Sequence, residues 1–71
     1  MKKHAILGKY GEQWSLNLGG AEYIDVTAGV SFVKALDEVS NMGWEVVSVF
    51  KDGNEIKALV AIDRVKYESH Y

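Results

Sequence analysis

The sequence predicts an α+β fold, with a small antiparallel sheet of about four strands and one helix packed on one face. A helical pattern ends at Gly43, and a strand pattern begins at once with Trp44. Apolar and polar residues alternate over residues 12–18, and Asp52-Gly53-Asn54 is typical of a hairpin turn. The expected chain order is strand, strand, an optional third strand, helix, strand, strand, in one domain spanning residues 1–71.

The amino-terminal part is expected to form a hairpin. Residues 4–10 are typical of a strand, with Gly8 as a candidate bulge, and Tyr10-Gly11-Glu12 predicts a tight turn. The next strand places its apolar side chains on one face, namely Trp14, Leu16 and Leu18. Gly19-Gly20 ends this strand, because glycine accepts the positive φ of a turn. Residues 21–26 fit either a third strand or a connection.

A helix is predicted over residues 29–42. Its apolar residues recur at three-to-four spacing and share one face: Val30, Val33, Leu36, Val39 and Phe32. Three residues are candidate N-caps, and the sequence does not choose among Asp25, Thr27 and Ser31. Gly43 is the expected residue after the helix, where a left-handed conformation closes it.

Both faces of the carboxy-terminal hairpin, strands 44–51 and 55–65, are apolar. Strict alternation places Trp44, Val46 and Phe50 on one face and Val47 and Val49 on the other, and the returning strand is apolar on both sides too. One helix covers only one face of a small sheet, so the second face needs another cover. We expect a self-association surface made of Val47, Val49, Leu59 and Ala61. The alternative is that the amino-terminal hairpin folds across this face within one chain.

Size and composition point in the same direction. The chain has 71 residues, no cysteine and two histidines, His4 and His70. A single core of this size rarely supplies more than about 3–5 kcal/mol, and without cysteine the chain has no disulfide to add to it. Two terminal histidines do not predict a metal centre, so we expect neither a metal nor a cofactor. Oligomerisation is then the remaining source of stability.

Charge and hydropathy argue against two classes of partner. The net charge is −2, which is a poor basis for binding nucleic acid. The apolar segment 5–7 ends at Gly8, so no signal peptide is expected. The longest apolar run, residues 58–62, is far shorter than the about 20 residues of a membrane-spanning helix. We therefore expect a cytoplasmic protein that contacts no membrane.

An amphipathic helix with Leu36-Asp37-Glu38-Val39 leads into Gly43-Trp44-Glu45-Val46-Val47-Ser48-Val49. This order resembles a family of small bacterial and phage domains of unknown function, DUF4177. The similarity covers about residues 30–65, and Lys3-His4-Ala5-Ile6-Leu7 is a weak counterpart of the family's first strand. The strand at 14–18 and its glycine turn depart from the family pattern. The resemblance implies a small α+β fold and no assigned activity.

Four residues are candidates for binding a ligand. Tyr10 and Trp14 could stack on a planar ligand, and Lys51 and Arg64 could hold a phosphate. The structural interpretation is that the aromatic residues belong to a core or an interface and that the charges protect strand edges. Trp44 is likewise expected to fill the corner between helix and sheet, with Glu45 facing outward. No serine, histidine and acid pattern indicates a catalytic triad, so no catalytic residue is predicted.

These observations favour a non-enzymatic, homo-oligomeric binding module that sequesters or inhibits a protein or a small signalling ligand. Phage and mobile-element proteins of this size are the analogy for such a role. The alternative is a small dimeric α+β enzyme or ligand-binding protein with a pocket between helix and sheet. The apolar helix face counts against the alternative.

Overall fold

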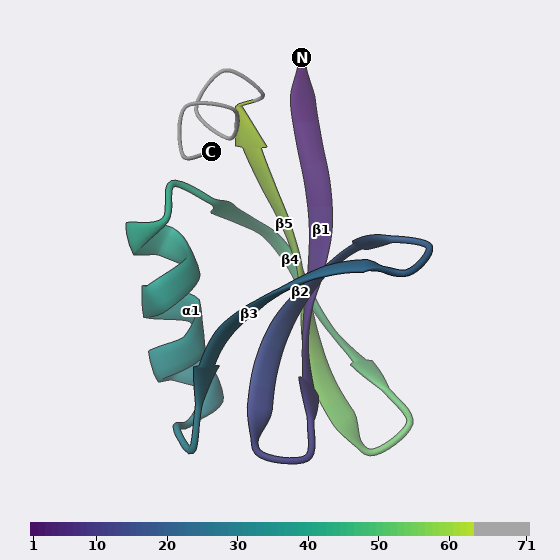
Figure 1. Ribbon diagram of the computed structural model, residues 1–71, viewed down its shortest axis with the longest axis vertical. Coiled ribbons are helices and arrows are strands. Elements are labelled where there is room, and N and C mark those ends of the chain that lie inside the picture. Colours follow the sequence, from purple (N-terminus) through teal and green to yellow (C-terminus); the bar gives the residue numbers. More distant parts are fainter. Residues whose placement is uncertain (64–71) are drawn as a thin grey trace.

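The computed structural model describes residues 1–63 and shows an α+β fold in this part of the chain (Figure 1). The elements are β1 (Lys2–Tyr10), β2 (Gln13–Gly19), β3 (Glu22–Ala28), α1 (Phe32–Asn41), β4 (Glu45–Asp52) and β5 (Glu55–Asp63). The strands form one antiparallel sheet in the order β3-β2-β1-β5-β4. The predicted fold class and the predicted helix are confirmed.

The predicted number of strands and their order need correction. The sheet has five strands among the described residues, because β3, left open as strand or connection, pairs with β2 through Leu16 and Ile24. The amino-terminal hairpin extends the main sheet, since β1 pairs with β5 through Ala5 and Val60. The alternative in which this hairpin folds across the second face is therefore wrong: it lies beside β5 in the sheet and covers neither face.

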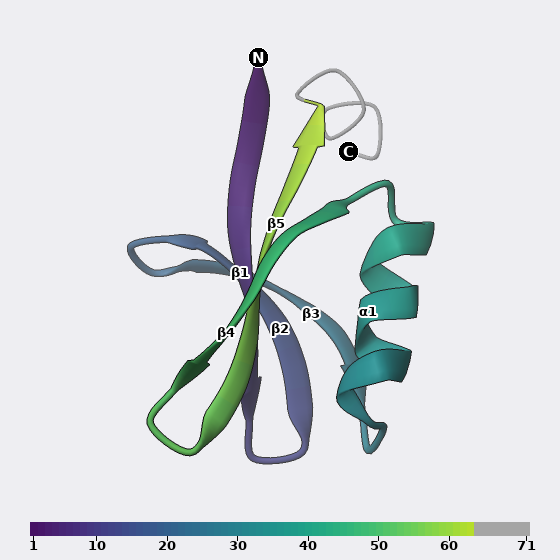
Figure 2. The ribbon, with the colours of Figure 1, turned by 180° about the vertical axis from the view of Figure 1, so that it is seen from behind.

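One face of the sheet packs against α1 and forms the core. Ala35 and Val39 of the helix are fully buried there. The sheet contributes the other buried apolar side chains of the core: Ala5, Leu7, Trp14, Leu16, Trp44, Ala58, Val60 and Ile62. The helix contacts β3 and β4, which are the two edge strands, and Figures 1 and 2 show it alongside the strongly twisted sheet. Twist of this kind lets one short helix reach both edges.

The helix begins three residues later than predicted. Ser31 is the N-cap, and its side-chain oxygen accepts a hydrogen bond from the Lys34 amide at 3.3 Å. The buried stripe accordingly runs through Phe32, Ala35, Leu36 and Val39. Val33, which was predicted to face the core, is 66% exposed, because it lies about 200° around the helix from Ala35.

The helix ends as the sequence indicates. Gly43 has φ +100°, the left-handed conformation expected for the residue after a helix. Its amide donates to the Ser40 carbonyl, and the Trp44 amide donates to the Val39 carbonyl, both at 3.0 Å. These two bonds define a Schellman motif, which turns the chain directly into β4 and places Trp44 in the core.

Ser31→Ala should lower the free energy of unfolding by about 1 kcal/mol, because the Lys34 amide loses its capping partner. Urea unfolding followed by circular dichroism measures this change. Ser40→Ala, at an exposed position near the end of the same helix, is the matched control and should be neutral or slightly stabilising. Equal losses in both variants would contradict the capping role.

The faces of β4 differ from those predicted by strict alternation. Val46 pairs with Val60 and Ser48 pairs with Leu59, so Val47 is an extra residue in a β-bulge. After the bulge, Val49 lies opposite Ala58 on the helix side, and Phe50 shares the opposite side with its partner on β5. The predicted placement of Val49 and Phe50 is therefore wrong, because one inserted residue reverses the alternation beyond it.

Candidate functional site

The face of the sheet opposite α1 is called the open face, because no element of residues 1–63 covers it. Its central strand presents Ile6 and Tyr10, which alternate with the buried Ala5 and Leu7. Large apolar side chains on this face are partly exposed, with Ile6 at 39%, Tyr10 at 57%, Tyr23 at 64% and Phe50 at 37%. Antiparallel sheets that face water usually present polar side chains, so this composition marks a binding surface.

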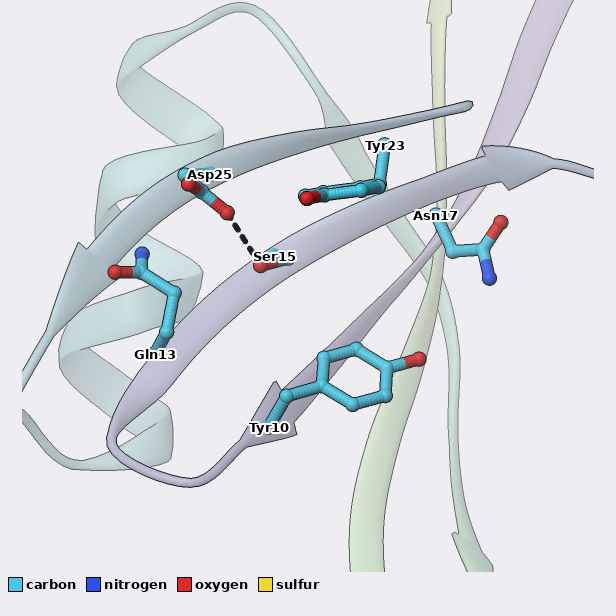
Figure 3. A pocket seen from close by; sticks show the side chains of 6 residues that line it. All are labelled: Tyr10, Gln13, Ser15, Asn17, Tyr23 and Asp25. Atoms are coloured by element: carbon cyan, nitrogen blue, oxygen red, sulfur yellow. Dashed lines mark hydrogen bonds between the residues drawn. The ribbon is translucent and has the colours of Figure 1, made fainter. Parts of the chain in front are cut away.

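A hollow of about 400 Å³ lies on the open face over β1, β2 and β3. We call it the tyrosine hollow, and Figure 3 shows its lining: Tyr10, Gln13, Ser15, Asn17, Tyr23 and Asp25. Strand pairing explains which side chains meet there, because Tyr10 is opposite Gln13 and Tyr23 is opposite Asn17. The two tyrosines come from the strands on either side of β2.

The hollow exists because its floor is made of small residues. Gly8 of β1 pairs with Ser15 of β2 at this level of the sheet. Gly8 has no side chain, and the methylene groups of Lys57 pass 3.6–3.9 Å from the position that a Cβ atom would take there. Larger residues at these two positions would fill the space between the tyrosines.

Hydrogen bonds fix three of the polar side chains that line the hollow. Ser15 is only 3% exposed, and its hydroxyl donates to Asp25 Oδ1 at 2.9 Å (Figure 3). The Gln13 amide donates to the carbonyls of Trp14 and Thr27 at 3.0 and 2.9 Å. Asn17 Oδ1 accepts a hydrogen bond from the Gly19 amide at 2.8 Å. The site is therefore held in shape before any ligand arrives.

Asp25 carries the formal charge of the tyrosine hollow at neutral pH, since none of the other five lining residues is ionised there. Lys57 lies next to the hollow, but its ammonium is bound to the Asp52 carboxylate at 2.9 Å. This hydrogen bond raises the pKa of Lys57 above its usual value, although desolvation opposes it. The nearest cation is thus paired within the chain, and the hollow keeps its negative charge.

A second hollow, of about 420 Å³, lies between the start of α1 and the start of β5. Trp14 forms its wall, and its indole Nε1 donates to the Val30 carbonyl at 2.9 Å. The ring centroid of Phe32 is 5.6 Å from that of Trp14, and Lys9 Nζ lies 5.7 Å from the Trp14 ring. We call this the helix–sheet hollow.

The four predicted ligand residues do not form one site. Tyr10 lies on the open face, whereas Trp14 is 3% exposed in the core on the opposite face. Lys51 is exposed on β4 opposite Ile56, away from the tyrosine hollow. Arg64 lies outside the described residues. The stacking pair of Tyr10 and Trp14 is therefore wrong, because adjacent positions across a tight hairpin turned them to different faces.

The four predicted interface residues are also spread over different surfaces. Val47 is exposed at the bulge, and Val49 is exposed on the helix side of β4. Leu59 is half-buried on the open face beside Ile6, and Ala61 is only 2% exposed. A single face containing all four is wrong, although two of them share the edge strand. The structural interpretation of Trp44 is confirmed, since it is 3% exposed in the core.

Three lining residues were not among the predicted site residues, namely Ser15, Tyr23 and Asp25. One signal for Ser15 was present, because it lies on the polar face of the alternating strand 12–18. Tyr23 and Asp25 belong to β3, whose identity as a strand was left open, and Asp25 had been considered as a helix cap. Without the pairing of β3 to β2, the sequence does not bring Asp25 to Ser15.

Comparison with protein-family models, curated proteins and solved structures finds no match to this chain. The resemblance to DUF4177 therefore stays a prediction. Within residues 1–63, no three histidine or acidic side chains come together as a metal site requires. In the same part of the chain, the ten-residue helix α1 is well short of the length needed to cross a membrane.

Proposed function

We propose that this chain is a non-enzymatic binding module that self-associates through β4 and holds a small ligand in the tyrosine hollow. The observation that carries the proposal is the exposure of β4, where all eight residues are exposed at the edge of the sheet. Four of them are large and apolar: Val46 at 45%, Val47 at 56%, Val49 at 48% and Phe50 at 37%.

An apolar edge strand favours a second copy of this chain as its partner. Free backbone groups on an edge pair readily with another strand, and soluble proteins usually block such edges with charge or proline. The middle of β4, residues 46–50, contains neither a charged residue nor proline. A twofold contact places the same strand of each copy against the other, so apolar side chains meet apolar side chains without unpaired charge. The small core, with no disulfide to support it, adds a reason to associate.

The edge and the hollow are separate. The tyrosine hollow lies over β1, β2 and β3, and β4 lies at the far edge beyond β5. A second copy bound along β4 therefore leaves the hollow accessible from the open face. Self-association and ligand binding can accordingly be changed by different substitutions.

The double variant Val47→Lys, Val49→Lys tests the self-association. The wild-type protein should have a native mass that is a multiple of 7.9 kDa, and the variant should have the mass of one chain. The physical reason is that two ammonium groups per copy would be brought together and desolvated at the edge. Native mass spectrometry and light scattering after gel filtration measure this, and circular dichroism verifies that the variant is folded.

Val33→Lys is the matched control, because Val33 is an equally exposed valine on α1, away from β4. It should keep the wild-type mass. A wild-type protein of 7.9 kDa, or a folded double variant that keeps the assembled mass, would sink the proposed interface.

A second candidate function is favoured by the helix–sheet hollow. The alternative of a small enzyme or ligand-binding protein needs a pocket between helix and sheet, and this hollow lies there. Lys9 and Glu55 bring charge to its rim. A ligand held there would perturb the nuclear magnetic resonance signals of Trp14 and Phe32, whereas a ligand in the tyrosine hollow would perturb those of Ser15 and Tyr23.

A further inference from the structure

We infer that the tyrosine hollow binds a small molecule carrying a planar cation, of the guanidinium or amidinium class. This inference deepens the proposed binding role and rests on it. It does not depend on self-association through β4, because the hollow lies on other strands.

The charge of the hollow favours a cation. Asp25 is exposed, and one of its carboxylate oxygens, Oδ1, accepts the Ser15 hydroxyl. A carboxylate offers about four acceptor positions on two oxygens, so this bond leaves most of its capacity for a ligand. An anionic ligand would face Asp25 with no cation among the lining residues, and the ammonium of the neighbouring Lys57 is engaged by Asp52.

The aromatic residues favour a cation that is also flat. Tyr10 and Tyr23 are more than half exposed, so their ring faces are not used in packing. Figure 3 shows the two rings on either side of β2, with Tyr23 next to Asp25. A cation placed over a tyrosine ring is attracted by the ring quadrupole, and a delocalised planar cation also stacks on it. Tyr23 and Asp25 lie two residues apart on one strand and therefore project from the same face.

The hydrogen-bonding geometry favours a group with several N–H donors in one plane. A guanidinium presents its donors as a fork that matches the two oxygens of a carboxylate, whereas an ammonium is a compact point charge. The Ser15 bond holds the Asp25 carboxylate in one orientation, which suits a directional contact of this kind. The volume of about 400 Å³ is within the range of small-molecule sites.

Titration of the full chain with agmatine tests this inference, with 1,4-diaminobutane as a cation of the same charge that lacks the planar group. Agmatine should shift the amide signals of Ser15, Tyr23 and Asp25 in a ¹⁵N-labelled sample. Asp25→Asn should weaken agmatine binding at least tenfold, since the asparagine oxygen still accepts the Ser15 hydroxyl while the charge is lost. Tyr23→Leu should weaken it as well, and 1,4-diaminobutane should bind more weakly than agmatine.

Asp37→Asn is the matched control, because it makes the same change of charge at an exposed position on α1. It should leave agmatine binding unchanged. Equal binding of agmatine by wild type and Asp25→Asn, equal binding of the two cations, or no binding of agmatine at millimolar concentration would each overturn the inference.

The same titration separates this inference from the proposed self-association. The double variant Val47→Lys, Val49→Lys should bind agmatine like the wild type. If this variant is a monomer that still binds agmatine, both proposals stand. If the wild-type protein assembles but does not bind agmatine, only the ligand class fails. If agmatine binds and the wild-type mass is that of one chain, only the interface fails.

Discussion

Replacing Trp14 with alanine is expected to leave most of the protein unfolded at room temperature. The indole is 3% exposed, its Nε1 donates to the Val30 carbonyl, and its ring packs against Phe32 at the start of α1. Removing such a side chain costs about 3–5 kcal/mol, through lost burial and the cavity left behind. A core of this size supplies about the same amount in total, so the folded state has little left.

Urea unfolding followed by tryptophan fluorescence and circular dichroism measures the effect, because Trp44 remains as a reporter. Trp14→Phe is the control that keeps an aromatic ring while removing the donor to Val30. It should lose about 1–3 kcal/mol, the usual penalty for a buried carbonyl left without its partner. A Trp14→Ala variant as stable as Trp14→Phe would show that the indole does not hold α1 on the sheet.

Leu7→Ala should lower the free energy of unfolding by about 2–5 kcal/mol, the second large effect we expect. Leu7 is fully buried in the central strand, between Leu16 on β2 and Ala58 on β5. Both neighbours are themselves fully buried, so they have little freedom to move into the space left by the missing side chain. Chemical unfolding at several protein concentrations measures the change and separates it from any change in assembly.

Ile6→Ala is the control on the same strand. Ile6 is 39% exposed on the open face and should cost less than about 1 kcal/mol. The ratio of the two losses tests which face of the sheet is the core. Similar losses for both variants would mean that a further element or a second copy covers the open face as tightly as α1 covers the other.

Local features of the fold were predictable from short stretches of sequence. Gly43 is required after the helix because the chain adopts φ +100° there. The turns at Gly11 and Gly53 follow from the same property, with φ of +64° and +67°. The alternation of Trp14 and Leu16 with polar residues predicted the buried face of β2 correctly. Each of these conclusions depends only on residues close together in the chain.

The candidate site was not predictable in the same way. Tyr10 was correctly selected as exposed and aromatic, but its expected partner Trp14 lies in the core. Asp25 reaches Ser15 only because β3 pairs with β2, and β3 contains an extra residue between its pairings with Trp14 and Ser15. The bulge at Val47 similarly moved Val49 to the helix side. Bulges depend on how two strands fit together, and neither strand shows them by itself.

The sequence by itself determined the fold class, the end of the helix, the turns and the need for a second cover on the sheet. Periodicity and glycine conformation control these features, and both are properties of the local chain. Only the tertiary structure decided the order β3-β2-β1-β5-β4, the residues of the open face and the lining of the tyrosine hollow. Those features depend on pairing between distant strands, where one inserted residue reverses every side chain that follows it.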